Sequence, residues 1–210
     1  MQTTLFIRLN TNPEQLLRLK ELQQNYVALC NAISPIALAN RCWNRVILHH
    51  MVYHKMREQF PNTGSQMICN AIYSVCRVFR IILQHPQSPW SVEASPGTRL
   101  PAIVFLEQTP VFFDRHTLNL KGSQLSMYTL NGRIRFALEL SAEDQRRFHE
   151  EKLKEILLVN DAIGFGLNFQ FLNGEDVIAD PLLADQWPEN ILVIPDRTTG
   201  DIPQAVANAL

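Results

Sequence analysis

The order of the apolar periodicities constrains the fold of this chain more than any other feature. In Thr3–Leu9 the aliphatic residues Leu5, Ile7 and Leu9 alternate with Phe6 and Arg8, which predicts a strand. Between residues 11 and 84 apolar side chains recur every three to four positions, which predicts helices, and after residue 101 alternation returns. One strand, then three helices, then several strands do not alternate as a parallel α/β sheet requires. We therefore expect an α+β fold.

Capping and breaking residues set the bounds of the three expected helices. A capping-box pattern at 12–15 (Asn-Pro-Glu-Gln) begins a helix that we expect to run to about Asn31. Pro35 is expected to open a second helix that reaches Phe60. A third helix is expected over residues 65–83.

Short strands are expected after a stretch at 85–101 that is rich in Pro, Ser and Gly. They are Ala102–Leu106, Val111–Phe113, Thr117–Leu120, Gln124–Tyr128 and Ile134–Leu138. Asn131-Gly132 predicts a two-residue hairpin turn.

The remaining chain is expected to hold one helix and one strand. Ser141 and Asp144 form a second capping box, which predicts a charged amphipathic helix over Ala142–Leu157. Alternating apolar residues predict a strand over 165–171 that ends at Asn173-Gly174. No structure is assigned to the acidic tail after Ile178.

The net charge of −1 conceals a division along the chain. Residues 1–138 hold 14 Lys and Arg against 6 Asp and Glu, a net charge of +8, whereas residues 139–210 hold 5 against 14, a net charge of −9. Such a division suggests a basic binding surface joined to an acidic segment that covers it or faces another partner. The alternative is that both sets are solvated faces with no common target.

Composition indicates a globular, cytosolic protein. Apolar residues make up 46% of the 210 residues and charged residues 19%. We expect no membrane association, because no apolar run approaches about 20 residues and no leader pattern is visible at the N-terminus. The four cysteines contain no C-x-x-C pair, so we expect them to be small buried residues and not zinc ligands.

A polar stripe on the third expected helix is the first candidate site. Gln66, Asn70, Tyr73 and Arg77 recur at helical spacing beside the apolar stripe of the same helix. Amide, phenol and guanidinium groups can contact base edges and phosphates. The alternative is an ordinary wet helix face.

Basic residues of the second expected helix are the next candidates. Arg41 and Arg45 are expected one turn apart on it, with Lys55 and Arg57 near its end, where they could follow a phosphate backbone. Solvated surface arginines are the alternative. His50 and His54 have i, i+4 spacing, but no third ligand is identifiable, so no metal or other cofactor is expected.

Four segments resemble, in order and spacing, the N-terminal half of the transposon-encoded TnpB proteins, RNA-guided DNA nucleases related to the type V CRISPR effectors. The resemblance covers about residues 3–172 and rests on Tyr26–Ser34 (YVALCNAIS), Leu48–Phe60 (LHHMVYHKMREQF), Ser65–Arg80 (SQMICNAIYSVCRVFR) and Ser126–Phe136 (SMYTLNGRIRF).

The resemblance implies a division of the chain. Residues 1–10 would supply the first strand of an oligonucleotide-binding-type β-barrel, the wedge domain, and residues 85–140 a linker and the remaining strands. Residues 11–84 would be an inserted three-helix recognition domain, and residues 141–210 an acidic helix, hairpin and tail.

It also implies roles for individual residues. In the family these parts hold the guide RNA and read a short DNA motif, while base pairing reads the sequence. By analogy the stripe on the third helix would approach target-adjacent DNA with Tyr53 beside it, and Lys121, Arg133 and Arg135 would favour RNA or DNA phosphates.

The chain departs from the family in the part that would carry chemistry. Leu157–Phe171 (LLVNDAIGFGLNFQF) looks like the hairpin that precedes the first catalytic strand, so Asp161 is interpreted as a turn residue and not a metal ligand. Fewer than 40 residues follow, too few for the RuvC-type nuclease and zinc finger of the family. We therefore expect no enzymatic activity and no catalytic residues.

Three hypotheses follow from the sequence. The first is a nuclease-less recognition module that binds structured RNA, duplex DNA or both. The second is a protein-interaction subunit whose acidic C-terminal third docks on a separately encoded RuvC-type nuclease or transposition protein. The third is a decayed gene product or one half of a split nuclease.

Overall fold

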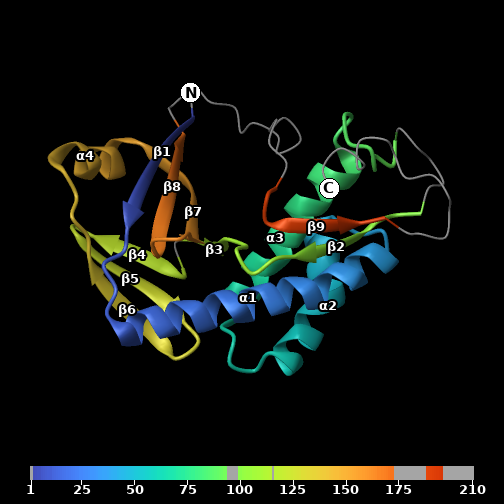
Figure 1. The fold of residues 1–210 in the computed structure, drawn as a ribbon, viewed down its shortest axis with the longest axis horizontal. Coiled ribbons are helices and arrows are strands. Elements are labelled where there is room, and N and C mark those ends of the chain that lie inside the picture. The colour runs from blue at the N-terminus through green and yellow to red at the C-terminus, as the bar shows by residue number, and fades with distance from the viewer. Residues whose placement is uncertain (1, 94–98, 115, 173–187, 196–210) are drawn as a thin grey trace.

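The computed structural model describes residues 2–93, 99–114, 116–172 and 188–195, which form a mixed α+β fold (Figure 1). This confirms the expected class. The described strands lie in a four-stranded sheet of order β1-β8-β7-β3, a three-stranded sheet of order β4-β5-β6 and the pair β2-β9. The helices are α1 (Pro13–Ala39), α2 (Arg45–Gln59), α3 (Ser65–Gln84) and α4 (Ala142–Glu150).

The four-stranded sheet pairs the first strand of the chain with strands that lie more than 100 residues later in the sequence. The strands are β1 (Gln2–Arg8), β3 (Val111–Phe113), β7 (Lys152–Asn160) and β8 (Phe165–Leu172), all paired antiparallel. The expected alternation in β8 is confirmed, because its four odd-numbered apolar side chains are buried. Asp161 and Gly164 form the tight turn between β7 and β8, as expected for Asp161. Asn173-Gly174 lies outside the described residues.

α1 begins where the sequence predicts and ends later. The side chain of Asn12 accepts a hydrogen bond from the backbone N–H of Gln15, and the side chain of Gln15 accepts one from Asn12, so the capping box is confirmed. The prediction that Pro35 opens a second helix is wrong, because α1 continues through it to Ala39.

Contacts with β2 (Ala102–Phe105) explain why the helix continues. The side chain of Asn31 both donates to and accepts from the backbone of Phe105, at 2.9 and 2.7 Å, and Ser34 Oγ donates to the carbonyl of Ile103. These bonds hold the helical turn before the proline against the strand, and this offsets the helical hydrogen bond that proline cannot donate.

α3 is the central helix of the core. Twelve of its residues are buried, and its apolar stripe packs on α1 and α2. By length and composition it could cross a membrane, but 67% of the relevant window is buried inside the protein. Packing in the core therefore accounts for its apolar character.

The prediction of one helix over Ala142–Leu157 is wrong in its second half. The Ser141–Asp144 capping box is present, but α4 ends at Glu150 and β7 begins at Lys152. Sheet pairing with β8 and β3 buries this segment, and that outweighs the helical preference of its Lys, Glu and Leu residues.

The three-stranded sheet consists of β4 (Leu118–Lys121), β5 (Gln124–Thr129) and β6 (Gly132–Ala137), close to the predicted strands. The predicted β5–β6 hairpin is present, but its two connecting residues are Leu130 and Asn131, because Gly132, with a φ of +87°, already pairs with Thr129. The strand β9 (Ile191–Ile194), which pairs with β2, was not predicted. Figure 1 shows α1 running from the β4–β5–β6 sheet at one end to the β2–β9 pair at the other.

Candidate nucleic-acid interface

Side chains alternate between two faces of the β4–β5–β6 sheet. One face is buried and contributes Leu125, Met127, Ile134 and Phe136 to the core. The other, which we call the outer sheet face, carries Asn119, Lys121, Gln124, Ser126, Tyr128, Arg133, Arg135 and Ala137.

The outer sheet face brings together three cations that the sequence predicted as ligands for nucleic acid. Lys121 lies opposite Gln124, and Arg135 lies opposite Ser126. All three cations, Arg133 included, are exposed. No Asp or Glu occurs within these three strands, so the side chains of this face carry a charge of about +3 at neutral pH.

Arg133 is held in a fixed position on the outer sheet face. Its guanidinium lies 4.6 Å from the ring centre of Tyr128 on the opposite strand. Its Nε donates to Ser126 Oγ and its Nη2 to the carbonyl of Ser126, both at 2.9 Å. Two of its five N–H groups are used in this way, so others remain to donate to a phosphate. Tyr128 is 42% exposed, and sequence reasoning did not select it as a site residue.

Side chains from the first turns of α1 hold the β5–β6 hairpin in position. Arg18 Nη2 donates to Thr129 Oγ1 at 2.7 Å and to two carbonyls of the turn. Gln15 donates to the backbone carbonyl of Arg135 at 3.0 Å. These contacts are polar and short, so the outer sheet face has a defined orientation relative to the helices.

A second group of cations lies where α1 meets α2, and we call Arg41, Arg45 and Arg80 the elbow cluster. The expectation that Arg41 lies on the second helix is wrong, since it lies in the connection before α2 with a φ of +46°. Arg41 and Arg80 line a groove of about 580 Å³ together with the half-buried Trp43. None of the described residues that line this groove is acidic.

Arg45 stands at the first turn of α2, and its guanidinium lies 5.3 Å from the ring centre of Tyr73. Burial raises the pKa of the nearby Cys76 thiol to about 11, although Arg80 and Arg45 both act to lower it. Both cations therefore lie within electrostatic range of one thiol. Arg80 was not among the predicted site residues.

Arg57 and Tyr53, which were also selected on α2, make internal contacts, whereas Lys55 is exposed. Arg57 Nη1 donates to the carbonyl of Thr63 at 2.6 Å, which fixes the loop between α2 and α3. The ring of Tyr53 stacks on His49 at 4.7 Å. Desolvation lowers the pKa of His49, and the neighbouring His50, Arg45 and His54 lower it further. Within the described ranges no three His, Cys, Asp or Glu side chains are grouped to hold a metal ion.

The polar stripe of α3 faces the four-stranded sheet, so its expected solvent-facing position is wrong. Asn70 is 1% exposed and donates to the carbonyl of Phe112 at 3.1 Å. Gln66 donates to Asp114 at 2.6 Å, Tyr73 packs on Phe112, and Arg77 pairs with Glu155. Each of these four side chains contacts β3, β7 or a residue beside them, so together they attach α3 to the four-stranded sheet.

The predicted site residues thus divide into three groups. Lys121, Arg133 and Arg135 share the outer sheet face, Arg41 and Arg45 belong to the elbow cluster, and the remaining six contact other parts of the protein. The six are Tyr53, Arg57, Gln66, Asn70, Tyr73 and Arg77. No protein-family model matches the chain, and no curated protein matches it significantly.

Proposed function

We propose that this chain is a non-catalytic nucleic-acid-binding protein whose outer sheet face contacts the phosphates of structured RNA or duplex DNA. The observation that carries the proposal is the grouping of Lys121, Arg133 and Arg135 around the exposed Tyr128, on strands without any acid. Exposed Lys and Arg side chains supply salt-dependent affinity for phosphates. An exposed tyrosine beside them can stack on an unpaired base.

The elbow cluster provides a second contact in this proposal. Arg41 and Arg80 line an acid-free groove that also exposes part of Trp43, and Arg45 lies at the first turn of α2. A phosphate in that groove would meet two guanidinium groups, and an unpaired base could stack on the indole.

The resemblance to TnpB proteins extends the proposal to ancestry and cellular location. On that basis the strands would belong to a wedge domain of the oligonucleotide-binding barrel type, and α1 to α3 to its inserted recognition domain. The protein would act in the cytoplasm, with a guide-type RNA or a short target-adjacent DNA motif as ligand. Gln66 and Asn70 have no direct role in this version, because their side chains already bind Asp114 and the backbone of Phe112.

The test is a fluorescence-anisotropy titration of structured RNA and of duplex DNA at several salt concentrations. Replacing Lys121, Arg133 and Arg135 with alanine should reduce the slope of log K against log salt by about 2 to 3, because each lost phosphate contact contributes about 0.7 to 0.9. A control triple variant of the exposed Lys20, Arg146 and Lys152 removes the same charge elsewhere.

The control separates a local interface from a general effect of charge. Equal losses in the two triple variants would refute the outer sheet face as the binding site. Absence of binding by the wild-type protein at low salt would refute the proposed function itself.

A protein-interaction role is the second candidate, and one observation on β9 favours it. Leu192 and Ile194 on this strand are 51% and 41% exposed, and β9 pairs with β2 alone among the described strands. Such an edge could receive a separately encoded nuclease or transposition protein. Replacing Leu192 and Ile194 with lysine should abolish co-purification with that partner and leave nucleic-acid binding unchanged. Loss of neither activity would refute this candidate.

A further inference from the structure

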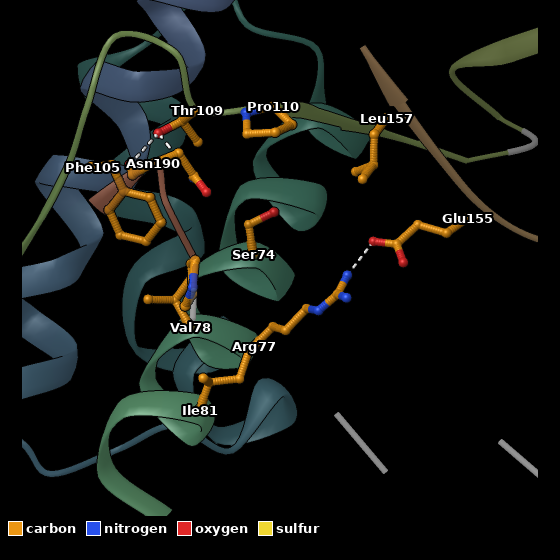
Figure 2. A pocket seen from close by; sticks show the side chains of 11 residues that line it. Ser74, Arg77, Val78, Ile81, Phe105, Thr109, Pro110, Glu155, Leu157 and Asn190 are labelled. Atoms are coloured by element: carbon orange, nitrogen blue, oxygen red, sulfur yellow. Dashed lines mark hydrogen bonds and ion pairs between the residues drawn. The ribbon is translucent and has the colours of Figure 1, made fainter. Parts of the chain in front are cut away.

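A cavity of about 260 Å³ lies between α3, β7, the β2–β3 connection and residues 188–190 (Figure 2). Its walls are mainly apolar and include Val78, Ile81, Phe105 and Leu157. The volume is just below the roughly 300 to 1,000 Å³ of pockets for drug-sized ligands. A single flat ring system is therefore the size of ligand that it suits.

One ion pair supplies the strongest polar groups of this cavity. Arg77 donates to Glu155 across its edge, and both side chains line it (Figure 2). The Glu155 side chain is 3% exposed, whereas that of Arg77 is 32% exposed. The two charges balance, so the cavity favours a neutral ligand over an ion.

The pair presents a donor beside an acceptor. A guanidinium has five N–H groups, and one of those of Arg77 is engaged by Glu155 Oε1. In the described part of the chain no donor contacts Glu155 Oε2. A ligand that has an acceptor next to a donor can therefore bind both groups at once.

We propose that this cavity binds one unpaired nucleobase, with guanine preferred. Guanine would donate its N1–H and N2–H groups to Glu155 and accept from Arg77 at O6. Adenine, cytosine and uracil each present one donor beside an acceptor on this edge, so they would make fewer bonds to the carboxylate. The apolar walls would contact the ring faces, as they do in pockets that receive unstacked bases.

This inference rests on the proposed function in one respect only. The guanine could belong to an unpaired nucleotide of the bound RNA or DNA, or to a free nucleotide. The bonds to Arg77 and Glu155 would be the same in either case, so the experiment must separate the two sources.

The experiment is a calorimetric titration of the full chain with GMP, AMP, CMP and UMP. GMP should bind about tenfold or more tightly than AMP, since hydrogen bonds to charged groups discriminate at that level. Methylation of GMP at N1 removes one donor and should abolish binding to the unaltered protein. Equal binding of GMP and AMP, or unchanged binding of the methylated nucleotide, would overturn the proposal.

Two variants locate the site. Glu155→Gln should weaken GMP binding about tenfold or more, and Val78→Phe should block the cavity. Glu150→Gln, on the exposed face of α4, is the matched control and should bind as the wild type does. If Glu155→Gln does not fold, the methylated nucleotide and Val78→Phe still decide the outcome.

Two further measurements distinguish this proposal from the function on which it rests. The triple alanine variant of Lys121, Arg133 and Arg135 should retain GMP binding. Single-stranded RNA that contains guanine should compete with GMP, whereas a blunt duplex should not. If neither the RNA nor the duplex competes, the cavity binds free nucleotides and not an unpaired base of the bound nucleic acid. GMP binding without any oligonucleotide binding would refute the proposed function alone, and oligonucleotide binding without GMP binding would refute the nucleobase site alone.

Discussion

Replacing Arg77 with methionine would leave a buried carboxylate without its cation. The Glu155 side chain is 3% exposed, and Arg77 is the only described cation paired with it. Breaking a buried ion pair from one side costs about 3 to 5 kcal/mol. Because Arg77 is 32% exposed, water reaches the site, so we expect the lower end of that range, about 3 kcal/mol. For a chain of this size the melting temperature should fall by about 6 to 12 °C.

A double-mutant cycle measured by urea unfolding tests this reasoning. The variant Arg77→Met/Glu155→Leu removes both charges and should lie within about 1 kcal/mol of the wild type, because an apolar pair can replace a buried ion pair at little cost. The coupling energy should then be about 2 kcal/mol or more. Arg146→Met is the control, because the side chains of Arg146 and its partner Glu150 are 63% and 68% exposed. It should cost less than about 1 kcal/mol.

The result that would refute the reasoning is a double variant as unstable as the Arg77→Met single variant. In that case the arginine would stabilise α3 through its aliphatic packing and not through the charge of Glu155. A loss below about 1 kcal/mol in the single variant would show instead that the carboxylate is well solvated.

Three other predictions concern single side chains. Asn12→Ala removes the cap of α1 and should lower the free energy of unfolding by about 1 kcal/mol in urea titrations; no change would contradict the cap. Bonds from Arg8 and from two backbone amides hold the pKa of Asp161 well below its usual range, so its stabilising contribution is present above about pH 4 and is lost as the pH falls. Asp161→Asn should flatten the stability profile below that pH, and an unchanged profile would contradict the Arg8 contact. Desolvation lowers the pKa of His49 in the folded protein. On acidification this histidine therefore binds a proton more readily in the unfolded chain, so the free energy of unfolding should fall as the pH drops below about 6.5. His49→Gln should weaken this pH dependence.

The features predicted correctly are those whose chemistry lies within a few consecutive residues. Both capping boxes, the β5–β6 hairpin and the turn at Asp161 are of this kind. A side chain that caps its own helix needs no distant partner, so its sequence pattern is sufficient. Strand alternation also places Lys121, Arg133 and Arg135 on one side of the sheet once the strands are located, but their binding of nucleic acid stays a prediction.

The incorrect predictions concern segments that are stabilised from far along the chain. α1 continues past Pro35 because Asn31 and Ser34 bind β2, about 70 residues later in sequence. The segment after Glu150 becomes a strand because β8 and β3 pair with both of its edges. Local propensity is a weak preference that such pairing outweighs.

The polar stripe of α3 shows the corresponding limit for site prediction. Helical periodicity shows that Gln66, Asn70, Tyr73 and Arg77 share one face beside the apolar stripe, and they do. It cannot show whether another layer covers that face. The signal lay elsewhere in the sequence: Asp114 directly follows the apolar strand β3, and Glu155 directly precedes the apolar run at 156–159 of β7. Glu155 is buried and Asp114 is half-buried, and acids in such positions require a polar partner from another element.

The positions of the two cation groups restrict what a common ligand can be. Arg18 contacts the hairpin of the outer sheet face, and Asn40 precedes the elbow cluster, so 22 residues of helix separate them, roughly 33 Å at 1.5 Å per residue. Salt screens exposed charges beyond about 8 to 10 Å, so neither group strengthens the field of the other. A mononucleotide or a short phosphopeptide would therefore meet two separate weak sites. A ligand that joins them must be a continuous polyanion of roughly ten nucleotides along one strand, at 3.4 Å each, and a helical turn of nucleic acid has that length.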